Sequence, residues 1–333
     1  MPRVEWLTLA MLLLCYGLWT VAGLAIWPVA PVAALALMAV MAALHSSLTH
    51  ECLHGHPTRS RRANELLASL PLTIFYPYRR YQALHLAHHN DERITDPFED
   101  PESYYVARWR HARMPGWLRA VLVVNNTFVG RVVLGPVLGA AGFLRDEARL
   151  LADGRRDVRR AWLLHLAGLL PVLALVQAFG IPIWVYVVGV AWPALSLISI
   201  RTFAEHRWHE APEGRTIIVE RSPLSWIFLN NNLHIVHHQI PSAPWYALPA
   251  LYAARAAHWR DLNRGYVYPG YGALFLAHAL RPKEPVVHPA LQREAPVTDI
   301  GPETLLAPAQ DLISGLSPDN DPGAPRPGGE RAA

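Results

Sequence analysis

The stretch that decides this fold reads HLAHH at residues 85–89, and a stretch of the same form, HIVHH, returns at residues 234–238. Positions three and four apart lie on one face of an α-helix, so each stretch directs three imidazoles the same way. Neutral imidazole is a common metal ligand, and such a face is otherwise unfavourable to bury. Two copies far apart in the sequence therefore predict a metal site built from distant parts of the chain.

Three more histidines extend this set. His50 and His54 are four apart and share a helix face, and His206 lies between the last apolar run and the second box. One zinc ion takes three or four protein ligands, so nine ring nitrogens suit two metals with open positions. An all-imidazole set does not by itself distinguish iron from zinc. The predicted metal ligands are His50, His54, His85, His88, His89, His206, His234, His237 and His238.

The apolar residues, 52% of the chain, gather into runs long enough to cross a bilayer, which takes about 20 residues each. The predicted spans are 6–27, 29–48, 162–180 and 182–200. Both connections within these pairs are uncharged, whereas arginines follow the second and fourth spans, so the histidine side is the cytoplasmic one. The predicted fold is an all-α polytopic membrane protein: four transmembrane helices in two hairpins, with a cytoplasmic histidine-rich helical cap, over residues 1–287.

Two segments are assigned by composition. Residues 117–144 are mostly apolar but include Arg131 and Pro136, and burying an arginine in mid-membrane is expensive, so we place them at the membrane interface. Residues 288–333 are rich in proline and glycine and low in apolar residues, which predicts a disordered tail.

The charge pattern limits the partners and the compartment. The formal net charge is +4, and every basic residue except Lys283 is an arginine. The arginines flank membrane segments and do not line a basic face, so we expect membrane lipids as partners and no nucleic acid. Cys15 and Cys52 have no evident disulfide role, in agreement with a reducing compartment for the catalytic part.

Several other polar residues are candidates for orienting the metal ligands. The acidic segment 91–102 is either a solvated loop or a source of carboxylates that accept the second N–H of a ligand imidazole. Asn231 is either a helix cap or a holder of metal-bound water. The candidates for this supporting role are Asp96, Glu205, Asn231, His45 and His209.

Two other function classes stay open. The pattern His50-Glu51-x-x-His54 is typical of zinc proteases that use the glutamate as general base. An intramembrane zinc protease would also need an Asp ligand in a membrane segment, and none of the predicted spans contains one. A membrane protein that binds lipid or stores metal without turnover is the second alternative.

At this point the sequence resembles a known family. The three histidine boxes after two membrane hairpins look like the membrane fatty acid desaturase and hydroxylase superfamily. The segments DPFEDPE (96–102), RTFAEH (201–206) and NNNLH (230–234) are similar to its bacterial hydrocarbon-oxygenase-like subgroup. The resemblance maps the eight box histidines onto motif ligands and His206 onto the extra ligand. Many members space the first pair five apart, as His45 and His50 are, but we prefer His50 with His54 because His45 falls inside the span.

The resemblance implies a non-haem centre of two iron ions that uses molecular oxygen. The implied reaction is hydrogen abstraction from an unactivated C–H bond of a fatty acyl or hydrocarbon chain, with desaturation and hydroxylation both open. No cytochrome b5-like or cysteine-rich carrier is visible, so we expect a separate ferredoxin or rubredoxin with its reductase. The expected location is the bacterial inner membrane, with both termini and the active site cytoplasmic.

Overall fold

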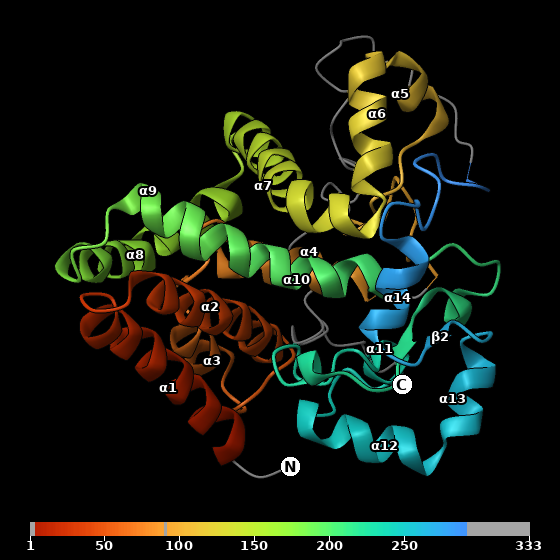
Figure 1. The fold of residues 1–333 in the computed structure, drawn as a ribbon. Coiled ribbons are helices and arrows are strands. Elements are labelled where there is room, and N and C mark those ends of the chain that lie inside the picture. Colours follow the sequence, from red (N-terminus) through yellow and green to blue (C-terminus); the bar gives the residue numbers. More distant parts are fainter. Residues whose placement is uncertain (1–3, 90–91, 292–333) are drawn as a thin grey trace, which may run out of the picture.

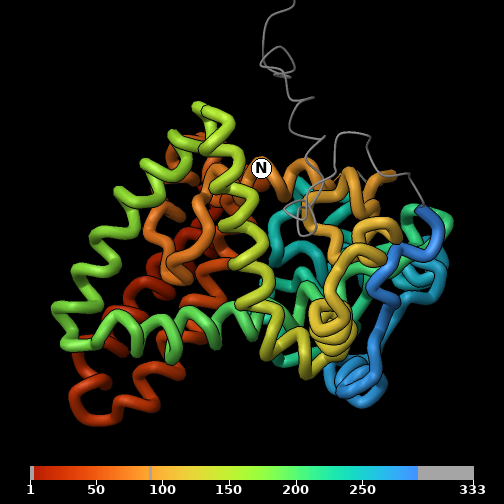
Figure 2. The backbone as a smooth tube through the Cα atoms, turned by 90° about the horizontal axis from the view of Figure 1, so that it is seen from above, coloured from red at the N-terminus to blue at the C-terminus, as the bar shows by residue number. Residues whose placement is uncertain are grey.

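The structure is a computed structural model that describes residues 4–89 and 92–291 of the 333-residue chain. Position 91 of the acidic segment and residues 292–333 of the predicted tail lie outside the described residues. Regular structure in the described part is helical apart from one parallel pair of short strands, β1 (Ile218–Val219) with β2 (Val267–Tyr268). This confirms the predicted all-α class. The long helices gather on one side of the molecule, and the chain from 206 to 291 forms most of the other (Figures 1 and 2).

The first two long helices are α1 (Trp6–Val21), which continues as the π-helical turn η1 (Ala22–Ile26), and α2 (Pro31–Leu53). Pro31 stands at the start of α2, where its missing N–H removes no helical hydrogen bond. The Cys15 thiol donates to the Met41 carbonyl oxygen at 3.0 Å, which joins α1 to α2. Both cysteines are free and buried.

The next two long segments are α8 (Arg156–Ala178) and a helical run made of α9 (Ile183–Tyr186), η2 (Val187–Ala191) and α10 (Trp192–Glu205). Gly180 reverses the chain between them at φ +75°, a conformation that glycine adopts without strain. The Trp19 indole donates to the Tyr186 hydroxyl at 3.1 Å, and that hydroxyl donates to the Leu72 carbonyl at 2.8 Å. These buried contacts satisfy the polar ends of both rings and join α1 to α9.

Within the described residues, five helices are long and apolar enough to cross a membrane, so the predicted count of four is not confirmed. The additional helix is α7 (Phe128–Ala152), which follows the short α6 (Gly116–Asn125) and covers most of the segment predicted to lie at the interface. The prediction treated Arg131 as costly to bury. Arg131 is nevertheless buried, because its guanidinium donates to the Asn125 carbonyl and the Asn126 side chain and lies 4.6 Å from the centre of the Tyr104 ring. Figure 2 shows α7 running steeply away from α10 toward the start of α8.

Shorter helices make the cap. After α2 the chain forms α3 (Arg61–Leu67), α4 (Tyr78–His88) and α5 (Arg108–Arg113). After α10 it forms α11 (His234–Gln239), α12 (Leu248–Ala254), α13 (Ala256–Leu262) and α14 (Tyr271–His278). One small core fixes α11: Ile235 and Val236 pack with Ile218 and Leu248, all almost fully buried. The short helix that bears the last histidine box is therefore held by apolar packing on its other face.

The segment after α14 packs against the cap over its described length. The Val106 N–H donates to the Val286 carbonyl at 2.8 Å, and the His288 ring lies 4.5 Å from the Trp208 ring and 5.0 Å from the Tyr105 ring. His288 is fully buried. The first residues of the predicted tail, 288–291, therefore belong to the folded part.

Candidate metal centre

The nine predicted ligands stand at the ends of helices. His50 lies in the last turn of α2 and His54 directly follows that helix. His85 and His88 lie in the last turns of α4, and His89 follows it. The remaining four are His206, directly after α10, and His234, His237 and His238 on α11. A helix end presents several side chains to one point while the helix body packs elsewhere.

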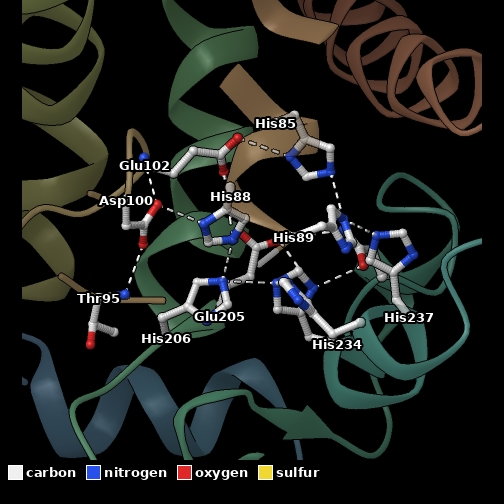
Figure 3. Close-up of polar contacts among 12 residues, drawn as sticks. His85, His88, His89, Thr95, Asp100, Glu102, Glu205, His206, His234 and His237 are labelled. Atoms are coloured by element: carbon white, nitrogen blue, oxygen red, sulfur yellow. Dashed lines mark hydrogen bonds and ion pairs between the residues drawn. The ribbon is translucent and has the colours of Figure 1, made fainter. Parts of the chain in front are cut away.

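The structure gathers these nine rings into two groups. Figure 3 labels His85, His88, His89, His206, His234 and His237 among them. We name the two groups the five-histidine group and the four-histidine group; within each, one ligand atom per residue lies within 4.8 Å of all the others. The five-histidine group consists of His50, His54, His85, His89 and His237. The four-histidine group consists of His88, His206, His234 and His238.

Each histidine box contributes to both groups, and it does so crosswise. In the box at 85–89, the first and last histidines join the five-histidine group and the middle one joins the four-histidine group. In the box at 234–238 the assignment is reversed. Positions i and i+4 lie almost one above the other on a helix, whereas i+3 is turned to the side, so one short helix serves two neighbouring centres.

The ring nitrogens that converge are the Nε2 atoms. The Nε2 of His85 lies 3.0 Å from that of His89 and 3.1 Å from that of His54. In the other group, the Nε2 of His206 lies 2.9 Å from that of His88 and 3.1 Å from that of His234. The buried Nε2 of His50 has no hydrogen-bond partner among the described residues.

The opposite nitrogens of three of these rings have oxygen partners. The Nδ1 of His88 lies 2.8 Å from a carboxylate oxygen of Asp100, and that of His85 lies 2.9 Å from Glu102. The Nδ1 of His234 lies 3.0 Å from the side-chain oxygen of Asn231. Each of these oxygens accepts the Nδ1 proton, which orients the ring so that its Nε2 atom faces the centre of its group.

Nε2 lone pairs that converge on one point are favourable only when a cation lies between them. Two neutral imidazoles whose Nε2 lone pairs face each other at about 3 Å repel, and the burial of unpaired polar atoms adds a further cost. A metal ion between them removes both problems, because each nitrogen then donates its lone pair to the ion. The residues present therefore fit a metal in each group.

The electrostatics keep most of these rings neutral. Burial and the neighbouring histidines lower the pKa of His54 to about 2 and hold the pKa of His89 far below its usual value. Burial opposes protonation of His88 as well, but the carboxylates of Asp100 and Glu102 outweigh it and raise the pKa of His88 to about 9. Glu102 stays ionised, since the nearby His85 and His88 overcome the effect of burial and lower its pKa.

The residues predicted to support the ligands lie in different places. Asn231 contacts His234, and Glu205 lies 3.7 Å from the His234 Nδ1 while pairing with Arg201 at 2.9 Å. Asp96 accepts the Phe98 N–H within its own loop. His45 and His209 belong to neither histidine group.

His45 and His209 bond elsewhere. The His45 Nε2 lies 2.8 Å from the Tyr16 hydroxyl, which places it beside α1. The His209 ring accepts the Ala211 N–H at 3.1 Å within its own loop. For the first pair of ligands, the structure thus brings His54, not His45, next to His50.

Sequence reasoning included Asp100 and Glu102 in the acidic segment but favoured Asp96 within it. The pairing depends on how the loop 92–103 folds back on α4: Asp100 also accepts the N–H groups of Thr95 and Glu102, which fixes its carboxylate toward His88. No residue spacing in the sequence indicates that this loop folds back on α4.

Two further side chains hold His206 by its backbone, and sequence reasoning missed both. The Tyr104 hydroxyl and the Lys283 ammonium each donate to the His206 carbonyl at 2.5 Å. Lys283 is the one lysine of the chain and is partly enclosed by aromatic rings. The presence of a single lysine in an arginine-rich sequence was the one feature that could have indicated a special role for this residue.

Glu51 does not occupy the position that the zinc protease alternative requires. Its Oε2 accepts the Trp245 N–H at 3.1 Å, and its Oε1 lies 3.7 Å from the Nδ1 of His50. It therefore lies behind His50, on the side away from the converging Nε2 atoms. His50 and His54 also share their group with three more imidazoles, unlike the ligands of a zinc protease.

Comparison with known proteins agrees with this site. The sequence model of the family described as "Fatty acid desaturase" matches residues 25–270. A curated relative, "sn-1 oleoyl-lipid 12-desaturase" of Arthrospira platensis, is 24% identical over 238 residues, which cover 66% of this chain and 65% of the relative. The match thus spans slightly less than two thirds of that relative's length.

Proposed function

As this chain belongs to the fatty acid desaturase family, we propose that it is a membrane-bound di-iron oxidoreductase. Its proposed reaction uses molecular oxygen and external electrons to desaturate or hydroxylate a fatty acyl or other hydrocarbon chain. The relative from Arthrospira platensis, whose name describes a lipid desaturase, supports a lipid substrate.

One observation carries the proposal: nine imidazoles from four separate parts of the chain divide into two adjacent groups with converging Nε2 atoms. A single metal would leave about half of these buried rings without a partner. Two iron ions suit the site better than two zinc ions, because the proposed reaction removes electrons from a C–H bond and zinc has no redox chemistry.

The role of the protein's side chains is to hold the metal ions and to orient the ligand rings. Asp100, Glu102 and Asn231 accept the Nδ1 protons of His88, His85 and His234 and so orient each Nε2 atom toward the metal position. Iron, when bound, supplies the one-electron chemistry with oxygen that no side chain provides. Burial of the four-histidine group keeps bulk water from that side of the centre.

The proposed membrane arrangement has four spans: α1, α2, α8 and the run from α9 to α10. The helix α7 is proposed to lie at the interface, because it runs steeply away from α10 (Figure 2). The arginines that follow α2 and precede α8 support a cytoplasmic location for the histidine groups in a bacterial inner membrane.

The proposed electron donor is a ferredoxin or rubredoxin served by its own reductase. Cys15 and Cys52 are both buried within long apolar helices. Neither is placed to hold an iron–sulfur centre at a surface where electrons arrive, so the electrons come from a partner.

The test combines metal analysis with lipid mass spectrometry. Cells that express the chain are expected to gain lipids lighter by two hydrogens, for desaturation, or heavier by one oxygen, for hydroxylation. The purified protein is expected to hold two iron ions per chain, and His88→Ala and His237→Ala are each expected to lower bound iron and abolish the lipid change. Full turnover and full iron content in both variants would contradict the proposal. Iron binding with no oxygen consumption in the presence of lipid and reductant would instead indicate a metal-storing protein.

A further inference from the structure

A cavity of about 390 Å³ adjoins the candidate metal centre. It lies among α2, α4, α7, α8 and α10 and reaches His206 of the four-histidine group. Arg131, in the first turns of α7, lines it. A Cβ atom at Gly135 would come 2.9 Å from the Cδ of Arg131 and 3.3 Å from the Ser199 hydroxyl. The glycine at position 135 therefore leaves the space in which the stem of Arg131 runs along the cavity wall.

The hydrogen-bond partners of Arg131 are all uncharged. Its Nε donates to the Asn125 carbonyl at 3.1 Å, and its Nη2 donates to the side-chain oxygen of Asn126 at 3.2 Å. Its Nη1 makes no hydrogen bond with a described residue and is not fully enclosed. Because only 8% of Arg131 is exposed and the residue lines the cavity, this open nitrogen faces the cavity. A buried cation without an anionic partner is unfavourable, so a ligand that brings a negative charge is favoured.

The carboxylates in the cavity lining already have partners of their own. They form three contacts: Glu65 with Arg79 at 2.6 Å, Glu205 with Arg201 at 2.9 Å, and Glu102 with the Nδ1 of His85 at 2.9 Å. Arg131 is thus the one arginine of the lining that pairs with no carboxylate of the described residues. The positive charge of its guanidinium is available to a ligand.

Lys283 adds a second positive charge beside Arg131. The Arg131 guanidinium and the Lys283 ammonium lie 4.6 and 5.7 Å from the centre of the Tyr104 ring, and 6.0 and 5.3 Å from that of the Phe203 ring. Lys283 donates to backbone carbonyls and a tyrosine hydroxyl, and the carboxylate of Glu284 accepts another tyrosine hydroxyl at 2.7 Å. Two cations therefore lie around the same pair of rings, and an anion in the cavity is attracted to both.

The wall next to Arg131 has room for a hydrocarbon chain. Gly135 and Gly139 follow Arg131 at four-residue intervals on the same face of α7, and both line the cavity. This face extends roughly 12 Å from Arg131 to Gly139 at 1.5 Å per residue. Leu195 and Ile198 of α10 also line the cavity. An apolar chain attached to the anion therefore meets glycines and aliphatic side chains.

We propose that Arg131 binds the anionic end of the ligand, a carboxylate or a phosphate, and that the chain of the ligand lies along Gly135 and Gly139. A guanidinium forms charge-assisted hydrogen bonds with either anion. The Tyr104 ring that packs on Arg131 also donates its hydroxyl to the His206 carbonyl, so the anion lies in the part of the cavity next to the four-histidine group. This inference rests on the proposed function and narrows it: the substrate is an anionic amphiphile, not a neutral hydrocarbon.

Four probes of equal chain length test the proposal: laurate, dodecyl phosphate, dodecanol and dodecyltrimethylammonium. Each is added to the purified chain in phosphatidylcholine nanodiscs, and calorimetry measures binding with and without bound iron, with empty nanodiscs as the blank. At least one anionic probe is expected to bind about tenfold or more tightly than dodecanol, and the cationic probe is expected to bind most weakly. Tighter binding of laurate would indicate a free fatty acid, and tighter binding of dodecyl phosphate a phosphorylated head group. Dodecanol binding as tightly as both anions would overturn the inference.

Arg131→Gln is the decisive variant, because it removes the charge and keeps an amide that can hydrogen-bond. It is expected to reduce the preference for the anion over dodecanol to less than about threefold and to leave dodecanol binding unchanged. Arg131→Lys keeps the charge and is expected to retain most of the preference. Arg119→Gln, at an exposed arginine outside the cavity lining, makes the same change in net charge and is expected to bind as the wild type does. An unchanged preference in folded Arg131→Gln contradicts the inference, and if that variant does not fold, the four probes on the wild-type chain still decide.

The two proposals fail separately. Two bound iron ions with no preference for an anionic probe would refute this inference and leave the proposed function intact. A wild-type chain that binds no iron would refute the proposed function. Because binding is also measured without iron, a preference for an anionic probe that depends on Arg131 would still support the anion site in that protein.

Discussion

The five-histidine group and the four-histidine group draw on the same two sequence boxes, but they differ in number and in burial. All four rings of the smaller group are buried, whereas His54 and His89 of the larger group are partly exposed. The smaller group is enclosed by Asp100, by Asn231 and by the C-terminal segment that carries Lys283. The larger group has one imidazole more, and two of its rings are partly exposed.

This difference indicates two ways of holding a metal. The four-histidine group has no ring to spare and depends on a fixed surrounding structure. The five-histidine group has an additional nitrogen, so the loss of one ring is expected to weaken its metal affinity less than the same loss weakens the four-histidine group, even where activity is lost. The following predictions test this contrast, beginning with the largest expected effect.

Removal of one ring is expected to affect the two groups unequally. His88→Ala leaves three rings in the four-histidine group and is expected to lower metal affinity there more than about 100-fold, beyond the range for losing an outer hydrogen-bond partner. His50→Ala leaves four rings in the other group, and the expected loss is less than about tenfold. Iron titration monitored by absorption and by elemental analysis measures both. Equal losses would show that the contrast between the groups is wrong.

The carboxylates behind the rings give the next test. Asp100 is buried beside His88, whereas Glu102, beside His85, has 31% of its side chain exposed. Asp100→Asn is therefore expected to lower metal affinity about 10- to 100-fold, and Glu102→Gln to lower it near the lower end of that range because water partly replaces it. Both variants keep the side-chain shape, so circular dichroism is expected to be unchanged. A larger effect from Glu102→Gln would reverse the proposed order.

Low pH is expected to destabilise the packing of residues 281–291 near the four-histidine group. The buried His288 ring accepts the N–H groups of Ala290 and Leu291, so it is neutral, and burial together with Arg215 lowers its pKa to about 4. The His288 ring of the unfolded chain titrates near pH 6.5. The contribution of the neutral ring to the free energy of unfolding is therefore complete above pH 6.5 and is lost as the pH falls toward 4; this contribution is at most about 3 kcal/mol.

Hydrogen exchange of residues 281–291 at several pH values measures this effect. Exchange is expected to accelerate between pH 6.5 and 4 in the wild type, and this acceleration is expected to be weaker in His288→Gln, which does not titrate. His258→Gln, at an exposed position, is the control and is expected to behave as the wild type does. Identical pH profiles for wild type and His288→Gln would rule out this role.

The smallest effect is expected at His209. Its ring bonds within its own loop and belongs to neither group. His209→Ala is therefore expected to change iron affinity by less than about twofold, well below the effect of losing an outer partner. A tenfold loss would show that the two groups do not account for the whole site.

Some features of this site were predictable from the sequence because they depend on neighbours along the chain. The spacing of His85, His88 and His89 fixes their shared helix face in any fold that contains that helix. The apolar runs likewise predicted the long helices, since their length matches a bilayer. The segment around Arg131 was harder, because the cost of burying an arginine depends on partners such as Asn126 and Tyr104 that only the folded chain brings near.

The residues that orient the ligand histidines were also difficult to predict from the sequence. Asp96, Asp100 and Glu102 are all acidic and close together in sequence, so composition does not rank them. Their roles differ because the loop folds back on itself at Asp100, through the N–H groups of Thr95 and Glu102. Lys283 is farther still from its partner His206 in sequence, and only tertiary packing joins them.

The sequence by itself determined that this protein is helical, that its long helices are apolar enough for a membrane, and that its histidines are spaced to bind metal. Those properties follow from local periodicity and composition, which do not depend on the rest of the chain. Only the tertiary structure decided that each histidine box divides crosswise between two centres, and which carboxylates lie behind the ligand rings. Both results depend on the relative placement of α2, α4, α10 and α11, because a ring nitrogen joins one centre or the other according to which distant helix end faces it.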